Sequence, residues 1–148
     1  MNKITIILLA FILIASACKK DEEETKSDPV VETGSLKMVY DGVTYTDVDQ
    51  KSLHLAYGVL TAKGTIGDGF LLSIIGVGED GSTVNFKPGI TSVMLDFGAA
   101  AGKEGFVAQS GTIKRTGKKV EIDVAGVTTS GDQKTLTATI VVIDVMGK

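Results

Sequence analysis

Short runs of alternating apolar and polar residues, separated by glycine-rich turns, follow one another from position 35 to the end of the chain. Alternation with a period of two is typical of β-strands that bury one face, and no stretch has the period of an amphipathic helix. The predicted strands cover residues 36–40, 43–46, 53–65, 70–77, 82–86, 90–97, 106–114 and 120–124. A closing strand follows, with threonines on its outer face; the residues expected on its inner face are Leu136, Ala138, Ile140 and Val142. About eight or nine short strands at a spacing of roughly ten residues predict an all-β fold, an antiparallel β-sandwich or barrel.

Two of these strands have informative patterns. The strand at 70–77 is apolar at nearly every position, which predicts a strand covered on both faces and the most buried one of the fold. In the strand at 120–124, Glu121 and Asp123 alternate with aliphatic residues, which predicts one face in the core and one in water. The dipeptide Asp41-Gly42 tolerates the positive φ angles of a two-residue turn and predicts a hairpin.

The N-terminal pattern differs from that of the β region. Lys3 supplies a positive charge, and residues 4–17 then carry no charge. A membrane-spanning helix needs roughly 20 apolar residues, whereas a shorter run that ends in small residues is typical of a signal peptide. We therefore expect a signal peptide at 1–17, a charged tether at 18–34 and a β domain at 35–148; a secretory signal followed by a free cysteine, or an uncleaved anchor, are the alternatives.

Residues 14–18, Ile-Ala-Ser-Ala-Cys, resemble the lipobox of bacterial lipoproteins, although Ala15 stands where Leu, Val or Ile is usual. The resemblance implies that Cys18 becomes the mature N-terminus and carries a diacylglycerol with acyl chains such as palmitate. A single cysteine in an exported chain cannot form an internal disulfide, so lipidation also explains its presence. Two or three acyl chains bind a membrane stably, whereas one binds marginally. Cys18 is thus the predicted lipidation site.

The segment after Cys18 is rich in charged residues and is expected to be a disordered spacer. Lysines followed by acidic residues directly after the cysteine resemble the surface-export signal of Bacteroidota-type lipoproteins. The segments 110–112, 119–122 and 135–139 are similar to small lipoprotein domains of unknown function from the same group. These resemblances imply a lipid-anchored domain on the outer membrane, at the cell surface or, alternatively, facing the periplasm. They imply no functional residue.

Charge limits the classes of partner. Removing residues 1–17 takes away Lys3 and changes the net charge from −3 to −4, which argues against nucleic acid and against anionic lipid bound through charge. Basic residues gather on one predicted hairpin, where they are expected to discourage edge-to-edge pairing, with an acidic partner as the alternative; they are Lys114, Arg115, Lys118 and Lys119.

Two glycine-rich stretches resemble nucleotide motifs. Residues 76–81 match G-x-G-x-x-G, but a β-prone segment follows where a dinucleotide site needs a helix. Residues 98–104 are one residue too short for a phosphate-binding loop, and Glu104 stands where a magnesium-binding Ser or Thr is needed. Both are predicted to be turns, and we expect no nucleotide and no cofactor.

Catalytic and metal-binding patterns are weak. His54 is the single histidine, which excludes a multi-histidine metal site, and no G-x-S-x-G motif supplies a nucleophile. Acidic residues gather in turns without the spacing of a calcium loop, so solvated turns are predicted and calcium stays open; they are Asp41, Asp47, Asp49, Asp68, Glu79 and Asp80. We assign no catalytic and no metal-binding residue.

The function predicted from the sequence is a non-catalytic binding or interaction module on a membrane anchor, with a protein or glycan as partner. A lectin-like protein of polysaccharide uptake is the alternative, and a small hydrolase, which would need two carboxylates across a cleft, is a second. The predicted partner contact is the loop between Phe97 and Phe106: Ala99, Ala100 and Ala101 would let another backbone approach, and Lys103 and Glu104 offer polar contacts. A slack connection is the alternative for this loop.

Overall fold

The computed structural model of this chain describes residues 32–65, 69–98 and 102–147. Four of the predicted site residues, Cys18 and the three alanines Ala99, Ala100 and Ala101, lie outside the described residues, as do the predicted signal peptide and most of the predicted tether. Residues from Glu32 to Lys148 form one compact unit, which contains the whole β domain.

The described part of the chain is all-β, as predicted, and contains one short 3₁₀ helix, η1 (Gln50–Ser52). The strands are β1 (Ser35–Tyr40), β2 (Val43–Tyr45), β3 (His54–Ala56), β4 (Val59–Lys63), β5 (Leu71–Ile75), β6 (Thr83–Asn85), β7 (Ser92–Asp96), β8 (Phe106–Thr116), β9 (Lys119–Thr128), β10 (Gln133–Val141) and β11 (Asp144–Met146).

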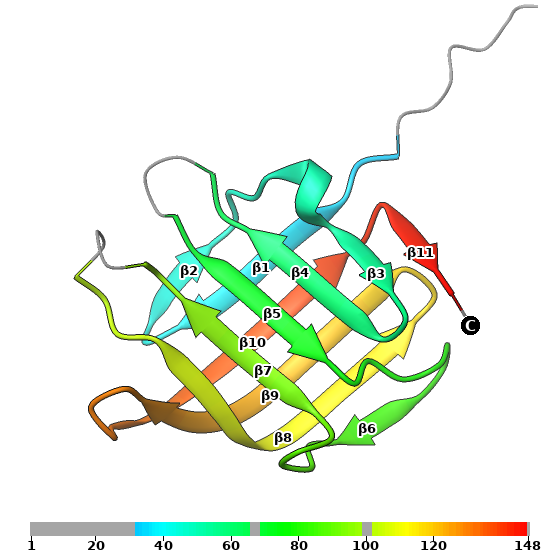
Figure 1. Ribbon diagram of the computed structural model, residues 1–148. Helices are drawn as coiled ribbons and strands as arrows, with labels where there is room; N and C mark the ends of the chain where they lie inside the picture. Colours follow the sequence, from blue (N-terminus) through cyan, green and yellow to red (C-terminus); the bar gives the residue numbers. More distant parts are fainter. Residues whose placement is uncertain (1–31, 66–68, 99–101, 148) are drawn as a thin grey trace, which may run out of the picture. The chain divides into compact units, whose positions relative to one another are not determined.

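All strands belong to one sheet, in the order β11-β3-β4-β5-β7-β8-β9-β10-β1-β2, with β6 paired to β8. The sheet is open and strongly curled, so that β3, β4, β5 and β7 lie in front of β1, β10, β9 and β8 (Figure 1). A sandwich of two separate sheets is not confirmed, because the strands form a continuous ladder. The strand number is eleven rather than eight or nine. All pairs are antiparallel except β11 with β3, which is parallel.

The inner face of the curled sheet forms the core. Every strand from β1 to β10 except β6 contributes buried side chains to it. In the longer strands these lie at alternate positions, as the period of two requires, except where the β-bulge interrupts β8. The inner face predicted for the closing strand is confirmed, because Leu136, Ala138 and Ile140 on β10 are all buried and Val142 just after it is buried too. The buried set consists mainly of aliphatic residues, and aromatic rings gather at one end of it.

The predicted long strand at 53–65 is wrong. The chain reverses at Tyr57-Gly58, where both residues have positive φ angles, 50° and 75°. The turn divides the segment into the antiparallel strands β3 and β4. It also inverts the alternation: Leu55 is buried, whereas the Tyr57 side chain is 82% exposed and Val59 faces outward.

The prediction that the strand at 70–77 is covered on both faces is also wrong. Leu72 and Ile74 on β5 are fully buried, but Leu71 and Ile75 remain 47% and 46% exposed. β5 lies in the middle of the sheet between β4 and β7, and no other described element covers its outer face (Figure 1). An apolar sequence on both faces therefore does not guarantee two covering layers.

Gly126 is required by the close approach of β8 and β9. It pairs with Ala108 beside the β-bulge between Ala108 and Ser110, and a Cβ atom there would overlap the Val107 carbonyl oxygen. We expect Gly126→Ala to destabilise the domain by about 1–3 kcal/mol, because backbone must move to admit the methyl group. Thermal unfolding measures this effect. Gly69→Ala is the matched control, since its Cβ would meet nothing within 4 Å; equal losses for the two variants would contradict the β8–β9 geometry.

Candidate functional site

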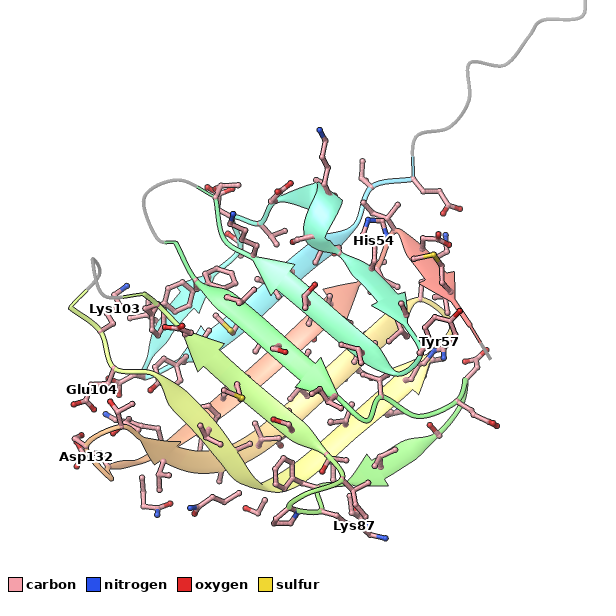
Figure 2. The ribbon with its side chains drawn as sticks, in the orientation of Figure 1. His54, Tyr57, Lys87, Lys103, Glu104 and Asp132 are labelled. Atoms are coloured by element: carbon pink, nitrogen blue, oxygen red, sulfur yellow. The ribbon has the colours of Figure 1, made fainter. Side chains whose placement is uncertain are left out.

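The loop between β7 and β8 emerges at one end of the curled sheet. Phe97 and Phe106, which bracket it, are buried in the core, so both ends of the loop are fixed. At its start the Asp96 carboxylate accepts a hydrogen bond of 2.8 Å from the Gly98 backbone N–H. The two predicted contact residues that the structure describes, Lys103 and Glu104, lie just before β8 at the same end (Figure 2).

Lys103 is held against aromatic rings. Its ammonium nitrogen donates a hydrogen bond of 3.2 Å to the Tyr45 hydroxyl. The same nitrogen lies 5.1 Å from the ring centroids of Tyr45 and Phe97, within the range of a cation–π interaction. These contacts join the loop to β2 and to the end of β7.

Glu104 is held by the turn between β9 and β10. Its carboxylate accepts a hydrogen bond of 2.6 Å from the Ser130 hydroxyl. The Ser130 hydroxyl oxygen also lies 2.9 Å from that of Thr128, which accepts a hydrogen bond from the Asp132 backbone N–H. The hydrogen bond from Ser130 is the main cause that lowers the pKa of Glu104. Lys103 and Glu104 thus attach the C-terminal end of the loop to two different parts of the sheet.

Ser130→Ala is expected to raise the pKa of Glu104 towards that of an ordinary glutamate, because the strongest donor to the carboxylate is lost. Since the folded-state pKa lies below the unfolded one, the contact stabilises the domain at neutral pH. That stabilisation is lost as the pH falls through the folded-state pKa. NMR titration of the side-chain carboxyl carbon measures the shift. Glu121, whose pKa is lowered chiefly by a hydrogen bond from Lys119, is the internal control and should not respond.

An ion pair between Asp41 and Lys134 stands beside these residues. The Lys134 nitrogen lies 2.7 Å from an Asp41 carboxylate oxygen, and this hydrogen bond is the main cause that raises the pKa of Lys134. Asp41 and Gly42 have φ angles of 49° and 76°, so the hairpin turn predicted from the sequence is confirmed. The pair fixes the β1–β2 turn against the start of β10.

The pocket at this end has a volume of about 320 Å³, and we call it the end pocket. It is lined by Tyr40, Asp41, Val43, Tyr45, Lys103, Glu104, Thr128, Asp132 and Lys134. Burial is the main cause that raises the pKa of Tyr40, so its phenol stays protonated at neutral pH. The wall therefore combines phenol hydroxyls with carboxylates and ammonium groups, which can bind amide or hydroxyl groups of a ligand.

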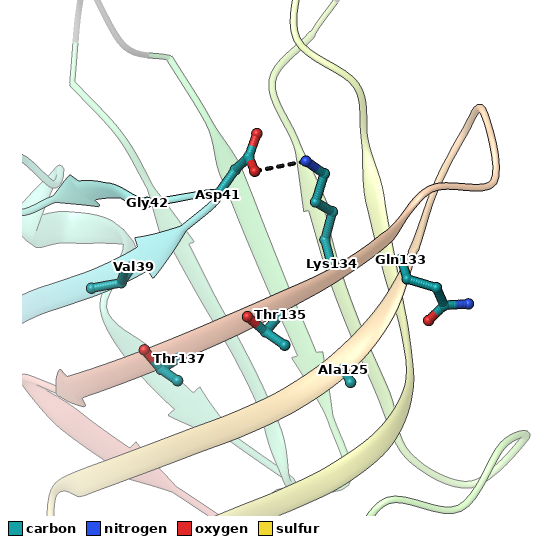
Figure 3. Close-up of a pocket in the computed structure, with 8 residues that line it drawn as sticks. All are labelled: Val39, Asp41, Gly42, Ala125, Gln133, Lys134, Thr135 and Thr137. Atoms are coloured by element: carbon teal, nitrogen blue, oxygen red, sulfur yellow. Dashed lines mark hydrogen bonds and ion pairs between the residues drawn. The ribbon is translucent and has the colours of Figure 1, made fainter.

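A second depression lies on the other side of the Asp41–Lys134 pair, on the outer face of β1, β9 and β10 (Figure 3). It has a volume of about 640 Å³ and is lined by Val39, Asp41, Gly42, Ala125, Gln133, Lys134, Thr135 and Thr137. The threonines face outward, as the sequence predicts for the closing strand. This outer groove is shallow and lined by both polar and apolar groups, and the two residues that it shares with the end pocket are Asp41 and Lys134.

No family model, curated protein or solved structure matches this chain. Its function has to be argued from the residues of these sites. Among the described residues, no helix is long and apolar enough to cross a membrane.

Apart from Asp41, the remaining candidates from the sequence do not converge on the end pocket. His54 lies on β3, and its Nδ1 atom is buried without a hydrogen-bond partner in the described part of the chain. The glycine-rich stretch at 76–81 leads into β6, and Asp80 accepts a hydrogen bond from the Gly117 backbone N–H there. Within the described ranges, no group of three or more His, Cys, Asp or Glu residues could hold a metal ion; Asp68 lies outside those ranges.

Sequence reasoning missed several residues of the end pocket. The sequence pattern predicts strand positions for Tyr40 and Tyr45 and a turn position for Asp41, and none of these predictions indicates a pocket. Lys134 is 93 positions away from Asp41, and only the pairing of β1 with β10 brings the two together. No local pattern in the sequence predicts that β1 pairs with β10.

Proposed function

We propose that this chain is a lipid-anchored protein that displays a non-catalytic binding module, and that the module binds its partner at the end pocket. The observation that carries the proposal is the attachment of Lys103 and Glu104 to the rim of the sheet, at the place where the loop was predicted to contact a partner. The lipobox-like residues that end at Cys18 support the anchor. The resemblance to surface-exported lipoproteins supports an outer-membrane location.

A rigid rim favours binding. Lys103 is held by Tyr45 and Phe97, and Glu104 by Ser130, so a partner meets side chains that are already ordered. Ordering before binding reduces the entropy lost on association. The pocket is small and carries both charges, which suits a backbone amide or a hydroxyl-bearing group better than a large apolar ligand.

A glycan is the second candidate partner, and one observation favours it. Tyr57 is 82% exposed at the tip of the β3–β4 turn, although a positive φ angle is unfavourable for tyrosine. An exposed aromatic ring can stack on a sugar ring. Tyr40 and Tyr45, in contrast, are almost fully buried.

Photo-crosslinking in the cells that produce the protein tests the end pocket. A photoreactive residue at Asp132, on the pocket wall, should give a defined adduct, whereas the same residue at Glu121, on the β8–β9 hairpin, should give none. Replacing Ala99–Ala101 by Gly-Ser-Gly should leave the melting temperature almost unchanged and weaken the Asp132 adduct. An adduct of equal strength at both positions, or one that the loop variant does not change, would contradict this site.

The glycan candidate has its own test. Binding of the domain to a panel of polysaccharides should be lost in Tyr57→Ala and kept in Tyr45→Phe, which preserves the buried ring. Polysaccharide binding that is insensitive to Tyr57→Ala would contradict stacking on this residue.

A further inference from the structure

The outer face of β4, β5 and β7 and the start of β8 carries five large apolar side chains, with polar residues such as Thr61, Ser73 and Ser92 between them. No described element lies over β5 on this side (Figures 1 and 2). Its large side chains are between 39% and 47% exposed; they are Val59, Leu71, Ile75, Met94 and Val107. The strand register pairs Val59 with Ile75 and Met94 with Val107, whereas Leu71 lies between Lys63 and Asp96. We call this surface the outer apolar face. Exposed apolar side chains that gather on one face are a feature of interaction sites.

Two opposite charges stand at one end of the outer apolar face. Lys63 on β4 and Asp96 on β7 are the direct neighbours of Leu71 on either side of β5. One strand spacing separates each of them from β5, so their Cα atoms lie about 10 Å apart. The hydrogen bond from the Gly98 N–H fixes the Asp96 carboxylate. A positive charge therefore lies on the β4 side of β5 and a negative charge at the same level on the β7 side.

We propose that the outer apolar face binds a second copy of this chain. A half-turn about an axis parallel to β5 places β5 of one copy over β5 of the other and β4 over β7. Leu71 and Ile75 then meet their own symmetry mates, and Lys63 of each copy faces Asp96 of the other. A two-fold interface must be self-complementary in this way. Two sheets packed face to face lie about 10 Å apart, a distance that a lysine and an aspartate side chain together can bridge.

The charges favour a second copy over a lipid surface. Anionic headgroups would repel Asp96 at the rim as much as they attract Lys63, and the chain is acidic overall, with a net charge of −3. Across a dimer, the same carboxylate meets a lysine. The apolar sequence of β5 on both faces, which led us to expect two covering layers, is also explained if the second layer comes from the other copy.

Sedimentation analysis of residues 32–148, which contain the whole core, tests the interface. The unmodified domain should form dimers. Lys63→Glu and Asp96→Lys should each raise the dissociation constant at least about 100-fold, because two like-charge contacts replace two attractive ones. An equimolar mixture of the two variants should dimerise again, since the introduced glutamate then faces the introduced lysine and the remaining Asp96 faces the remaining Lys63. Thermal unfolding of each variant checks that the fold is intact.

A matched pair of variants tests the apolar part. Ile75→Lys should abolish the dimer, whereas Val43→Lys, at an equally exposed aliphatic residue of β2, should not. A monomeric unmodified domain, single charge variants that dimerise normally, or a mixture that stays monomeric would overturn the proposal. Binding of the unmodified domain to phosphatidylcholine vesicles that is lost in Ile75→Lys would assign the face to a membrane and overturn it as well.

Discussion

Replacing Ile74 by aspartate is expected to unfold the domain. Ile74 on β5 is fully buried, and its register partners Leu60 on β4 and Val93 on β7 are fully buried too. A carboxylate at this position would have no cation and no donor from its immediate neighbours. Burying an unpaired charged group costs several kcal/mol, against a total stability of about 5–15 kcal/mol for a domain. Circular dichroism and calorimetry should show the loss of a cooperative transition.

Val43→Asp is the control for this substitution. It makes the same chemical change at an aliphatic residue that is 48% exposed on β2. Substitutions at exposed positions usually change stability by less than about 0.5 kcal/mol. If the two variants lost similar stability, the division of the sheet into an inner and an outer face would be wrong.

Replacing Cys18 by alanine is expected to release the protein from the membrane. In our proposal, the acyl chains on Cys18 supply nearly all of the membrane affinity, at about 0.8 kcal/mol per buried CH₂ group. The β domain does not include Cys18, so it should fold normally in this variant. Fractionation of cells into membrane and soluble pools measures the effect.

In this experiment the effect of the proposed signal peptide on membrane binding must be separated from that of the proposed lipid. A control chain in which a cleavable secretory signal replaces residues 1–17 should be soluble whether alanine or serine replaces the cysteine. Full partition of this control with membranes, in its Cys18→Ala form, would contradict lipid anchoring.

Local features of the sequence were good predictors of local structure. The Asp41-Gly42 turn, the first half of β9 and the inner face of β10 were predicted correctly because alternation and turn chemistry act between near neighbours. The split at Tyr57-Gly58 was missed because tyrosine is not a typical residue for a positive φ angle. The parallel strand β11 was missed because its few residues are held through the backbone of β3.

Long-range features could not be predicted. The alternation of apolar and polar residues shows that a strand has two faces, but it does not show whether another layer covers each face. Leu71 and Ile75 were expected to be buried because they are apolar, but no described element covers them. The same limit applies to the end pocket. Lys103 and Glu104 were identified because they lie in one loop, whereas Asp41 and Lys134 meet only through the pairing of β1 with β10.

The mass of the intact protein purified from membranes tests the proposed anchored module most directly. The proposal predicts a chain that begins at Cys18, lacks residues 1–17 and carries a diacylglycerol in thioether linkage on the cysteine sulfur. Mild digestion should assign the added mass to the peptide that contains Cys18. A chain that retains Met1, or one that carries an unmodified thiol at Cys18, would contradict the proposal.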